Sequence, residues 1–377
     1  MAPARSRPLI ERLWQRPLSA RWWPLWAALT PASAIYSGAL AMRERWWRTR
    51  AATAEATTIS VGNLTVGGNG KTPFTLFLAS RLRARGLAVA IISRGWGRTD
   101  AGAALVSDGT RVLMTPREAG DEPVMMAKSF AGPIAVARRR IDAARMLSAR
   151  GHFDAFILDD GFQHLRLRRD LDLLLINSAR GFGNGWVLPA GPMRERRAAI
   201  ARADAIVLIE SGAVRAGALT DDDLAVLACK PVFHASIRAR ALVHPDAAGW
   251  HESPLAVGGR RIVAVSGLAD PTGFHAMLRE LGATIVATLD FPDHHDYAPH
   301  DLENILAAAH RADMIVTTEK DLVKLERFPA PGVSLYALRL EVSMDSSDEA
   351  RLFDLVASRM RAPGAAASPR EYRRSPD

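Results

Sequence analysis

The sequence predicts an α/β fold with a mostly parallel sheet and helices on both of its faces. Two observations carry this prediction. Short apolar runs alternate with helix-like segments over two long stretches of the chain, and the first run leads through a glycine-rich turn into a helix. The predicted strands are 57–62, 88–93, 133–137, 154–158, 171–176 and 204–209 in the first stretch, and 232–237, 261–265, 284–288, 314–317 and 334–339 in the second.

The glycine-rich turn has the pattern of a phosphate-binding P-loop. A strand ends near Val61, and an apolar-periodic helix begins just after Lys71 and Thr72. Glycines let backbone N–H groups converge on phosphate oxygens, while the lysine reaches the terminal phosphates and the hydroxyl binds Mg²⁺. The loop has threonine where the usual motif has its first glycine, and it resembles the double-glycine version of the motif. The predicted nucleotide-binding residues are Thr65, Val66, Gly67, Gly68, Asn69, Gly70, Lys71 and Thr72.

Composition narrows the class of protein. A hydrophobic content of 48% is ample for a packed core, and the single cysteine, Cys229, excludes an intramolecular disulfide and fits a reducing compartment. The net charge of +9 suits a polyanion or an anionic membrane. Aromatic residues gather near the N-terminus instead of interleaving with the basic ones, so no nucleic acid partner is expected. No obligate protein partner is evident either.

The first 50 residues are basic and apolar. Residues 22–42 carry no charge, and arginines flank them on both sides. This length just suffices to span a bilayer, but prolines and hydroxyl residues dilute its hydrophobicity and a spanning helix favours arginines on one side only. Tryptophans and arginines together favour a helix or helix pair lying in the interface of an anionic membrane. A helix packed on the protein's own core is the alternative.

Two pairs of adjacent carboxylates are candidate metal or catalytic groups. Asp159 and Asp160 end a buried strand, at the edge where open α/β sheets bind ligands, and adjacent carboxylates call for a cation such as Mg²⁺. A solvated turn is the alternative. Asp121 and Glu122 begin a helix-like segment, a position that the helix dipole alone also favours.

Basic and imidazole groups complete the candidate set. Asp293 and His294 lie between a strand and a helix, where the histidine suits acid/base work; zinc is not expected because the neighbouring histidine cannot easily face the same ion and no cysteine accompanies them. Surface histidines are the alternative. Guanidinium groups suit phosphate oxygens. The candidates are Arg94, Arg138 and Arg194.

In their order, these motifs resemble those of the tetraacyldisaccharide 4'-kinase family of the lipid A pathway in Gram-negative bacteria. The resemblance implies ATP and Mg²⁺ as cofactors, and transfer of the γ-phosphoryl group to the 4'-hydroxyl of tetraacyldisaccharide 1-phosphate. It also implies an enzyme on the cytoplasmic face of the inner membrane. The motifs are the P-loop with Pro73, Ser93-Arg94-Gly95, Gly120-Asp121-Glu122-Pro123, Asp159-Asp160-Gly161-Phe162-Gln163-His164, 188–195, 291–295 and Thr318-Glu319-Lys320-Asp321.

The family pattern also implies residue roles. Asp121 matches the catalytic carboxylate that accepts the hydroxyl proton, and His294 with Asp293 matches its partner pair. Lys71 and Thr72 match the groups that hold the phosphates and Mg²⁺, with Glu122, Asp159 and Asp160 as further metal groups. Asp121 and His294 come from opposite halves of the chain, so the resemblance implies a site between two lobes. The chain departs from the pattern at Trp96, where the family more often has tyrosine.

The sequence predicts a division of the chain into four segments. They are a membrane-associating segment 1–50, a P-loop nucleotide-binding domain 51–215, a smaller α/β C-terminal lobe 216–361 and a disordered tail 362–377. Residues 104–106 and 111–114 are expected to form a β-hairpin, and helices are expected near 271–281 and 299–310.

Two other classes remain open. A cytosolic P-loop ATPase of the partitioning or metallochaperone type would hydrolyse ATP without a lipid; Val66, in place of that class's lysine, and the N-terminal segment both disfavour it. A membrane-binding module with a regulatory nucleotide site is the other.

Overall fold

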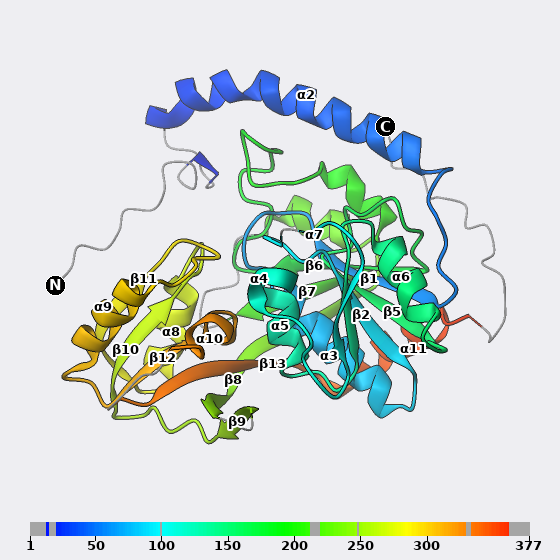
Figure 1. Cartoon of the computed structure of the whole chain (residues 1–377). Coiled ribbons are helices and arrows are strands. Elements are labelled where there is room, and N and C mark those ends of the chain that lie inside the picture. Colours follow the sequence, from blue (N-terminus) through cyan, green and yellow to red (C-terminus); the bar gives the residue numbers. More distant parts are fainter. Residues whose placement is uncertain are drawn as a thin grey trace.

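A computed structural model describes residues 13–14, 20–98, 100–211, 219–246, 249–328 and 333–361. The predicted disordered tail, 362–377, and most of the first 19 residues lie outside this described part. Within it, the predicted fold class is confirmed: a mostly parallel sheet runs through the molecule with helices on both faces (Figure 1).

The described residues form one sheet of 13 strands. Its order is β11-β10-β12-β13-β8-β7-β6-β1-β5-β2-β4-β3, with β9 paired to β8. The pairs β3/β4, β8/β13 and β8/β9 are antiparallel and the others are parallel. The strands are β1 (Thr57–Asn63), β2 (Val89–Ser93), β3 (Ala104–Asp108), β4 (Pro133–Val136), β5 (Ala155–Asp159), β6 (Leu171–Asn177), β7 (Ala205–Ser211), β8 (Val232–Asp246), β9 (Gly249–Ser253), β10 (Arg261–Ser266), β11 (Thr284–Asp290), β12 (Met314–Thr318) and β13 (Leu335–Met344).

Helices cover both faces of the sheet. In the N-terminal lobe, Phe74 and Leu78 of α3 pack with Ile59 of β1, while Ile141 of α6 packs with Phe156 on the opposite face of β5. The described helices are η1 (Ala20–Trp22), α2 (Trp23–Trp47), α3 (Lys71–Ala84), α4 (Pro116–Ala119), α5 (Asp121–Ala127), α6 (Arg140–Ser148), η2 (Arg197–Arg202), α7 (Asp221–Leu227), α8 (Thr272–Glu280), α9 (Pro299–Ala309), α10 (Glu319–Leu325) and α11 (Ser346–Ala357).

The C-terminal lobe repeats this sandwich on a smaller scale. Its strand β10 alternates its apolar side chains between two clusters: Ile262 packs with Leu278 of α8, and Val263 packs with Ile305 of α9. Strands β8 and β13 run beneath both lobes and join them (Figure 1). The two lobes are therefore parts of one continuous sheet.

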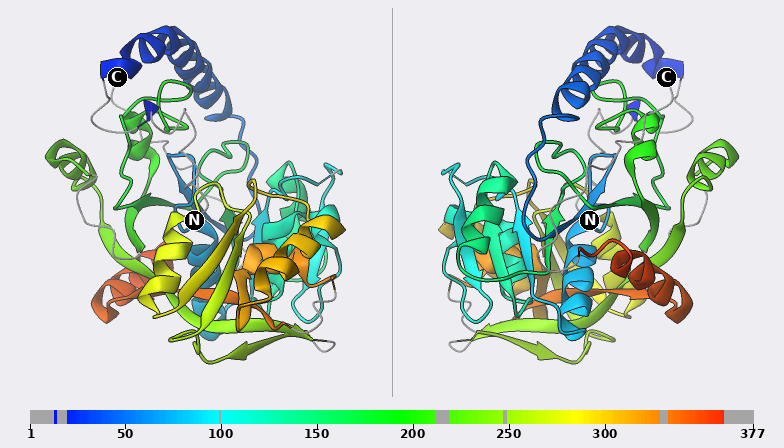
Figure 2. Two further views of the ribbon diagram at one scale, coloured as in Figure 1. Left: turned by 90° about the vertical axis from the view of Figure 1, so that its left-hand side faces the viewer. Right: turned by 90° about the vertical axis from the view of Figure 1, so that its right-hand side faces the viewer.

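Helix α2 lies across the top of the molecule, apart from the sheet layers (Figures 1 and 2). Its buried residues are two serines, Ser33 and Ser37, whereas Ile35 and Met42 are 75% and 71% exposed. The Ser33 hydroxyl donates to the carbonyl of Val187 at 3.0 Å. The segment Ala20–Trp47 is the one described helix long and apolar enough to cross a membrane. The side of the helix that faces the protein thus carries the two serines, Tyr36, which packs against the core, and Trp26, whose ring lies 5.1 Å from that of Trp186, while Ile35 and Met42 face outward.

Two sequence-based expectations need correction. The expected hairpin of 104–106 and 111–114 forms only in part: one antiparallel bridge joins Ser107 to Val112 and the Leu113 N–H donates to the Val106 carbonyl at 2.8 Å, whereas the ladder of β3 is made with β4. Strand β4 buries most of its residues, so pairing there removes more apolar surface than a short exposed hairpin would. Strand β8 also extends well beyond 237 and pairs with β9, which the sequence did not predict.

Candidate active site

The P-loop connects β1 to α3 at the carboxyl edge of the sheet. Gly70 takes a left-handed conformation (φ 72°) directly before α3 begins, and a side chain there would collide with Ile237. Asn69 braces the loop by donating to the carbonyls of Thr65 and Gly67 at 3.3 and 3.1 Å. Gly68 is exposed, with open space where a side chain would point. This loop is ordered by its own side chains and keeps its glycine pair accessible to a phosphate chain.

The lysine of the loop lies among groups from three neighbouring segments. The Lys71 Nζ atom is 3.1 Å from Oδ1 of Asn63 and 3.3 Å from Oδ1 of Asp160. Arg194 holds both oxygens of Asp160 at 2.9 Å. Burial opposes ionisation of Asp160, but Lys71 and Arg194 outweigh it and lower the pKa of Asp160 to about 2. Asp160 is thus a firmly ionised carboxylate between two cations.

Its neighbour Asp159 has the opposite electrostatic setting. Asp159 is 2% exposed and accepts hydrogen bonds from Thr75 at 3.2 Å and from Ser93 at 3.3 Å. Burial, with the nearby charges of Glu122 and Asp160, raises the pKa of Asp159 to about 7. A buried carboxylate of this kind is relieved by a cation placed beside it.

Asp121, from the second pair of carboxylates, lies close to a histidine of the C-terminal lobe. Asp121 begins α5, and its Oδ2 atom is 3.3 Å from Nδ1 of His294, a residue with positive φ (59°) in the loop after β11. The same oxygen accepts a hydrogen bond at 2.8 Å from Lys324 of α10. Burial raises the pKa of Asp121, but the hydrogen bonds from His294 and Lys324 lower it below its ordinary value. The site therefore holds an ionised carboxylate bound to an imidazole.

Asp293 lies at the edge of this pair. Its Oδ1 atom is 4.0 Å from Nε2 of His294, accepts a hydrogen bond from the backbone N–H of His294 at 3.1 Å and pairs with Lys320. Asp293 thus holds the loop that carries His294.

The candidate arginines differ in position. Arg194 is at the site, Arg94 is exposed and lies over the ring of Trp96 at 5.4 Å, and Arg138 is exposed. The buried member of the 138–140 cluster is Arg140, which is 5% exposed. Burial lowers the pKa of Arg140 to about 10, against the opposing pull of Asp160 and Asp159.

His164 lies near several of these arginines, in a region of positive charge. Burial first, and then the positive charges of Arg140, Arg169, Arg166 and Arg94, lower the pKa of His164 to about 3. This histidine is therefore neutral at physiological pH, and the region around it favours an anion.

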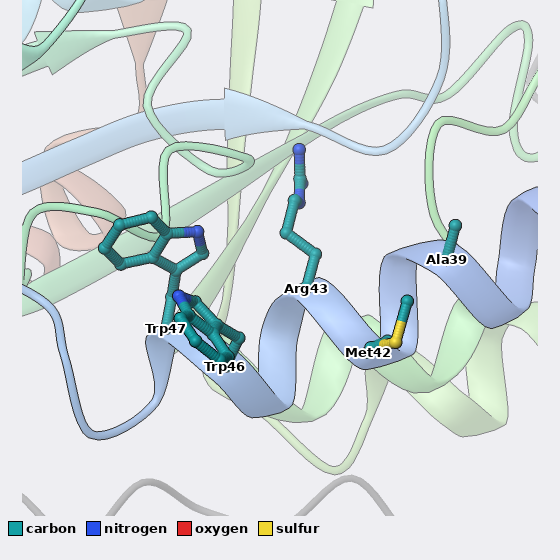
Figure 3. Close-up of a pocket in the computed structure, with 5 residues that line it drawn as sticks. All are labelled: Ala39, Met42, Arg43, Trp46 and Trp47. Carbon is teal, nitrogen blue, oxygen red and sulfur yellow. The ribbon is translucent and has the colours of Figure 1, made fainter.

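Helix α2 reaches this region. Arg43 donates to the carbonyl of Gln163 at 3.3 Å, and Arg166 lies over the ring of Trp47 at 4.8 Å. A shallow surface pocket near the C-terminal end of α2 is lined by Ala39, Met42, Arg43, Trp46 and Trp47, and Figure 3 shows the Arg43 side chain extending from α2 toward the body of the protein.

A magnesium ion fits the oxygen donors of this edge. No group of three or more His, Cys, Asp or Glu side chains in the described part of the chain is arranged to hold a metal by itself. Mg²⁺ in phosphoryl-transfer sites uses one or two carboxylates together with substrate phosphates and water, so such a group is not required. The observation that fits this ion is Asp159, a buried carboxylate beside the carboxylate of Asp160, with the hydroxyl groups of Thr75 and Ser93 as its hydrogen-bond donors.

Sequence reasoning missed several groups that the structure brings to the site. Asn63 touches Lys71, Thr75 touches Asp159, and Lys324 touches Asp121. Asn63 lies at the end of β1 and Thr75 lies one turn into α3. Both could have been identified from the sequence, because they flank the P-loop motif. Lys324 could not, because only the fold brings α10 against α5.

Comparisons with known proteins agree with this geometry. The family model described as "Tetraacyldisaccharide-1-P 4'-kinase" matches residues 25–361. A tetraacyldisaccharide 4'-kinase of Geobacter metallireducens is 43% identical over 290 residues, covering 76% of this chain and 83% of the relative. That of Anaeromyxobacter sp. strain K is 40% identical over 383 aligned residues, covering 97% of this chain and 99% of the relative.

A solved structure gives the same result. The crystal structure described as the "apo" form of LpxK from Aquifex aeolicus in complex with ATP superposes with a TM-score of 0.72 at 30% sequence identity, covering 89% of this chain and 100% of that chain. The family model covers nearly the whole described chain, and relatives match it along most of their length. This chain belongs to the tetraacyldisaccharide 4'-kinase family.

Proposed function

We propose that this protein transfers the γ-phosphoryl group of ATP to the 4'-hydroxyl of tetraacyldisaccharide 1-phosphate in lipid A biosynthesis. Membership of the family supports the reaction. The observation that carries the proposal is the pairing of Asp121, in the P-loop lobe, with His294 of the other lobe. The residue after Asp121, Glu122, acts on the charge of Asp159, whose neighbour Asp160 contacts the P-loop lysine. A P-loop ATPase without an acceptor has no need of the pairing between the two lobes.

The P-loop binds the phosphates of ATP. Backbone N–H groups of Gly67, Gly68 and Gly70 converge on phosphate oxygens, and α3 adds the positive end of its dipole. Lys71 leaves Asp160 for the terminal phosphates, and the partial exposure of this pair, 3.3 Å apart, makes it accessible to the nucleotide. The nucleotide-binding residues that we propose run from Thr65 to Thr72.

Thr72, Glu122, Asp159 and Asp160 are the residues that would hold Mg²⁺. This ion neutralises charge on the phosphates when it is bound. Asp160 already has two cationic partners, whereas Asp159 has two hydroxyl donors and acidic neighbours, so Asp159 is the stronger candidate for metal contact.

Asp121 accepts the proton of the acceptor hydroxyl, with His294 and Asp293 as its partners. The hydroxyl oxygen then forms a bond to the γ-phosphorus, the bond from that phosphorus to the β,γ-bridging oxygen breaks, and its electron pair leaves with ADP. Phosphoryl transfer depends mostly on positioning and charge stabilisation, so this set of groups suffices.

Arginines on the same edge bind the anionic groups of the substrate. Arg194 contacts Asp160, and Arg94 and Arg140 form the positive region around His164. Arg138, two positions before Arg140, is exposed. The 1-phosphate of the acceptor is the charge that this region would neutralise.

We further propose that helix α2 anchors the enzyme on the cytoplasmic face of the inner membrane. Its outward face carries Ile35, Met42 and Trp46, and exposed arginines such as Arg45 and Arg48 flank the apolar stretch. Apolar side chains enter the acyl boundary and arginines attract anionic lipid. The acceptor is then drawn from the bilayer on which the helix lies.

The test uses the full-length protein with γ-labelled ATP and the tetraacylated disaccharide in mixed micelles. We expect label on the lipid, dependence on Mg²⁺, and its loss in the Lys71→Ala variant. Release of labelled inorganic phosphate without labelled lipid would instead make the protein an ATPase. A disaccharide already phosphorylated at the 4'-position is the control that must accept no label.

A further inference from the structure

Lys324 makes the closest described charged contact to Asp121. Its Nζ atom lies 2.8 Å from Oδ2 of Asp121, nearer than the 3.3 Å of His294 Nδ1 to the same oxygen. We infer that Lys324 is a positioning residue that holds the Asp121 carboxylate in the orientation needed for phosphoryl transfer. This inference rests on the function proposed above.

The lysine is directed at Asp121 by its own surroundings. The other carboxylate within reach among the described residues, Asp321, is 3.9 Å away. Asp321 accepts hydrogen bonds on Oδ2 from the backbone N–H of Gly267 at 2.9 Å and from the Thr318 hydroxyl at 2.6 Å, whereas Lys324 faces its Oδ1 from beyond hydrogen-bond distance. Asp121 is therefore the stronger partner of Lys324.

Burial makes this contact strong. The side chain of Lys324 is 5% exposed and that of Asp121 is 12% exposed, so solvent screens them little. The ring of Tyr297 lies 5.6 Å from Nζ and adds a favourable contact for a cation. A buried ammonium is kept where it has an opposite charge to pair with, and here that charge is the proposed base.

The geometry explains what Lys324 does for the reaction. Both hydrogen bonds, from Lys324 and from His294, fall on Oδ2 of Asp121. With Oδ2 held from two directions, the carboxyl group cannot rotate freely, and Oδ1 becomes the oxygen offered to the acceptor. His294 lies in a loop, whereas Lys324 belongs to a helix, so the lysine supplies the firmer of the two constraints.

The structure contains a matched control for this contact. Lys128, directly after α5, pairs with Glu326, directly after α10, at 3.0 Å. The two lysine pairs join the same two segments of the chain, but the Lys128 pair lies at the far end of α5 from Asp121. Removing either charge weakens this interface, and only Lys324 touches the proposed base.

The experiment compares Lys324→Met, Lys324→Arg and Lys128→Met in the full-length protein, with kcat, KM for the lipid, Kd for ATP and melting temperature as readouts. We expect Lys324→Met to lower kcat about 10- to 100-fold while Kd for ATP and KM stay within about twofold. Lys324→Arg should recover a large part of this loss. Lys128→Met should keep kcat near that of the wild type even if its melting temperature falls as far.

Three results would overturn the inference: wild-type kcat in Lys324→Met, an equal loss of kcat in Lys128→Met, or a parallel rise in Kd for ATP. If Lys324→Met does not fold, Lys324→Gln, which keeps a hydrogen-bond donor, is judged by the same readouts. If the wild-type protein does not label the lipid, the proposed function itself is contradicted. The three results above are measured on a wild-type protein that is active, so they test the role of Lys324 alone.

Discussion

Arg194 and Asp160 form a two-point contact in which one guanidinium nitrogen, Nη1, lies 2.9 Å from both carboxylate oxygens. Lys71 approaches the same carboxylate less closely, at 3.3 Å. Arg194 therefore shares the negative charge that would otherwise belong to the P-loop lysine alone. This sharing leaves Lys71 more readily available to a nucleotide.

The first prediction concerns this competition. In Arg194→Gln, Asp160 pairs with Lys71 alone, and the phosphates of ATP must displace a stronger ion pair. We expect the affinity for ATP to fall about tenfold, measured by calorimetry. Arg351→Gln, which removes an exposed arginine paired with Asp348, should leave the affinity unchanged. An unaltered affinity in Arg194→Gln would show that the two cations do not compete.

The second prediction concerns the proposed base. Asp121→Asn keeps the shape of the side chain but cannot accept the hydroxyl proton, so kcat should fall at least about 100-fold. Affinity for ATP should hardly change, because Asp121 is not among the predicted phosphate ligands. Asp296→Asn, an exposed residue two positions beyond His294, is the matched control and should be fully active. Near-normal kcat in Asp121→Asn would remove Asp121 from the catalytic role.

The third prediction concerns pH and the stability of the metal-free protein. Burial, with Glu122 and Asp160, raises the pKa of Asp159 from 3.8 to about 7. The folded state then binds more protons than the unfolded chain between about pH 4 and pH 7, so the free energy of unfolding falls as pH rises through this window. From pH 6 to pH 8 we expect Asp159 to lower it by about 1 kcal/mol in the presence of EDTA.

Chemical unfolding followed by tryptophan fluorescence measures this difference. In Asp159→Asn, the pH dependence of the free energy of unfolding that Asp159 causes should be lost, since the amide does not titrate. Asp142→Asn, which removes a half-exposed carboxylate paired with Arg139, should retain it. Equal pH dependence in the wild type and in Asp159→Asn would mean that Asp159 titrates as an ordinary carboxylate.

The fourth prediction concerns the outward face of α2. Charges introduced by Ile35→Glu and Met42→Glu together oppose entry into the acyl boundary and repel anionic lipid. We expect binding to anionic vesicles to fall at least about tenfold, measured by sedimentation, while turnover in detergent micelles is largely kept. Leu224→Glu with Val226→Glu, at two exposed positions of α7, is the control that should bind normally. Unchanged vesicle binding in the α2 variant would contradict a membrane role for this face.

Much of the fold followed from local pattern. The fold class, the family and the kinase function predicted from the sequence are confirmed. The strand β1 and its P-loop were readable because β-branched residues, glycines and a lysine occur in the order that the structure requires. Strand β9 and the second half of β8 were missed, since both are partly exposed and polar and Pro245 lies within β8.

The site was readable only in part, and the residue roles stay predictions. Carboxylates at strand ends were visible because the edge of a parallel sheet is fixed by its topology. The cluster 138–140 gave no sign of which arginine is buried, since that depends on where α6 begins. The contact of Lys324 with Asp121 joins positions 203 residues apart, and no local pattern encodes it.

A short chain of contacts links α2 to the P-loop. The Tyr36 hydroxyl donates to the carbonyl of Arg194 at 3.2 Å, the Arg194 side chain holds Asp160, and Asp160 approaches Lys71. Because these contacts hold the P-loop close to α2, a kinase anchored by α2 would meet its acceptor within the surface layer of the membrane and not in bulk water. Its rate should follow the mole fraction of acceptor among the lipids, so that adding inert lipid at constant total acceptor would slow the reaction by surface dilution.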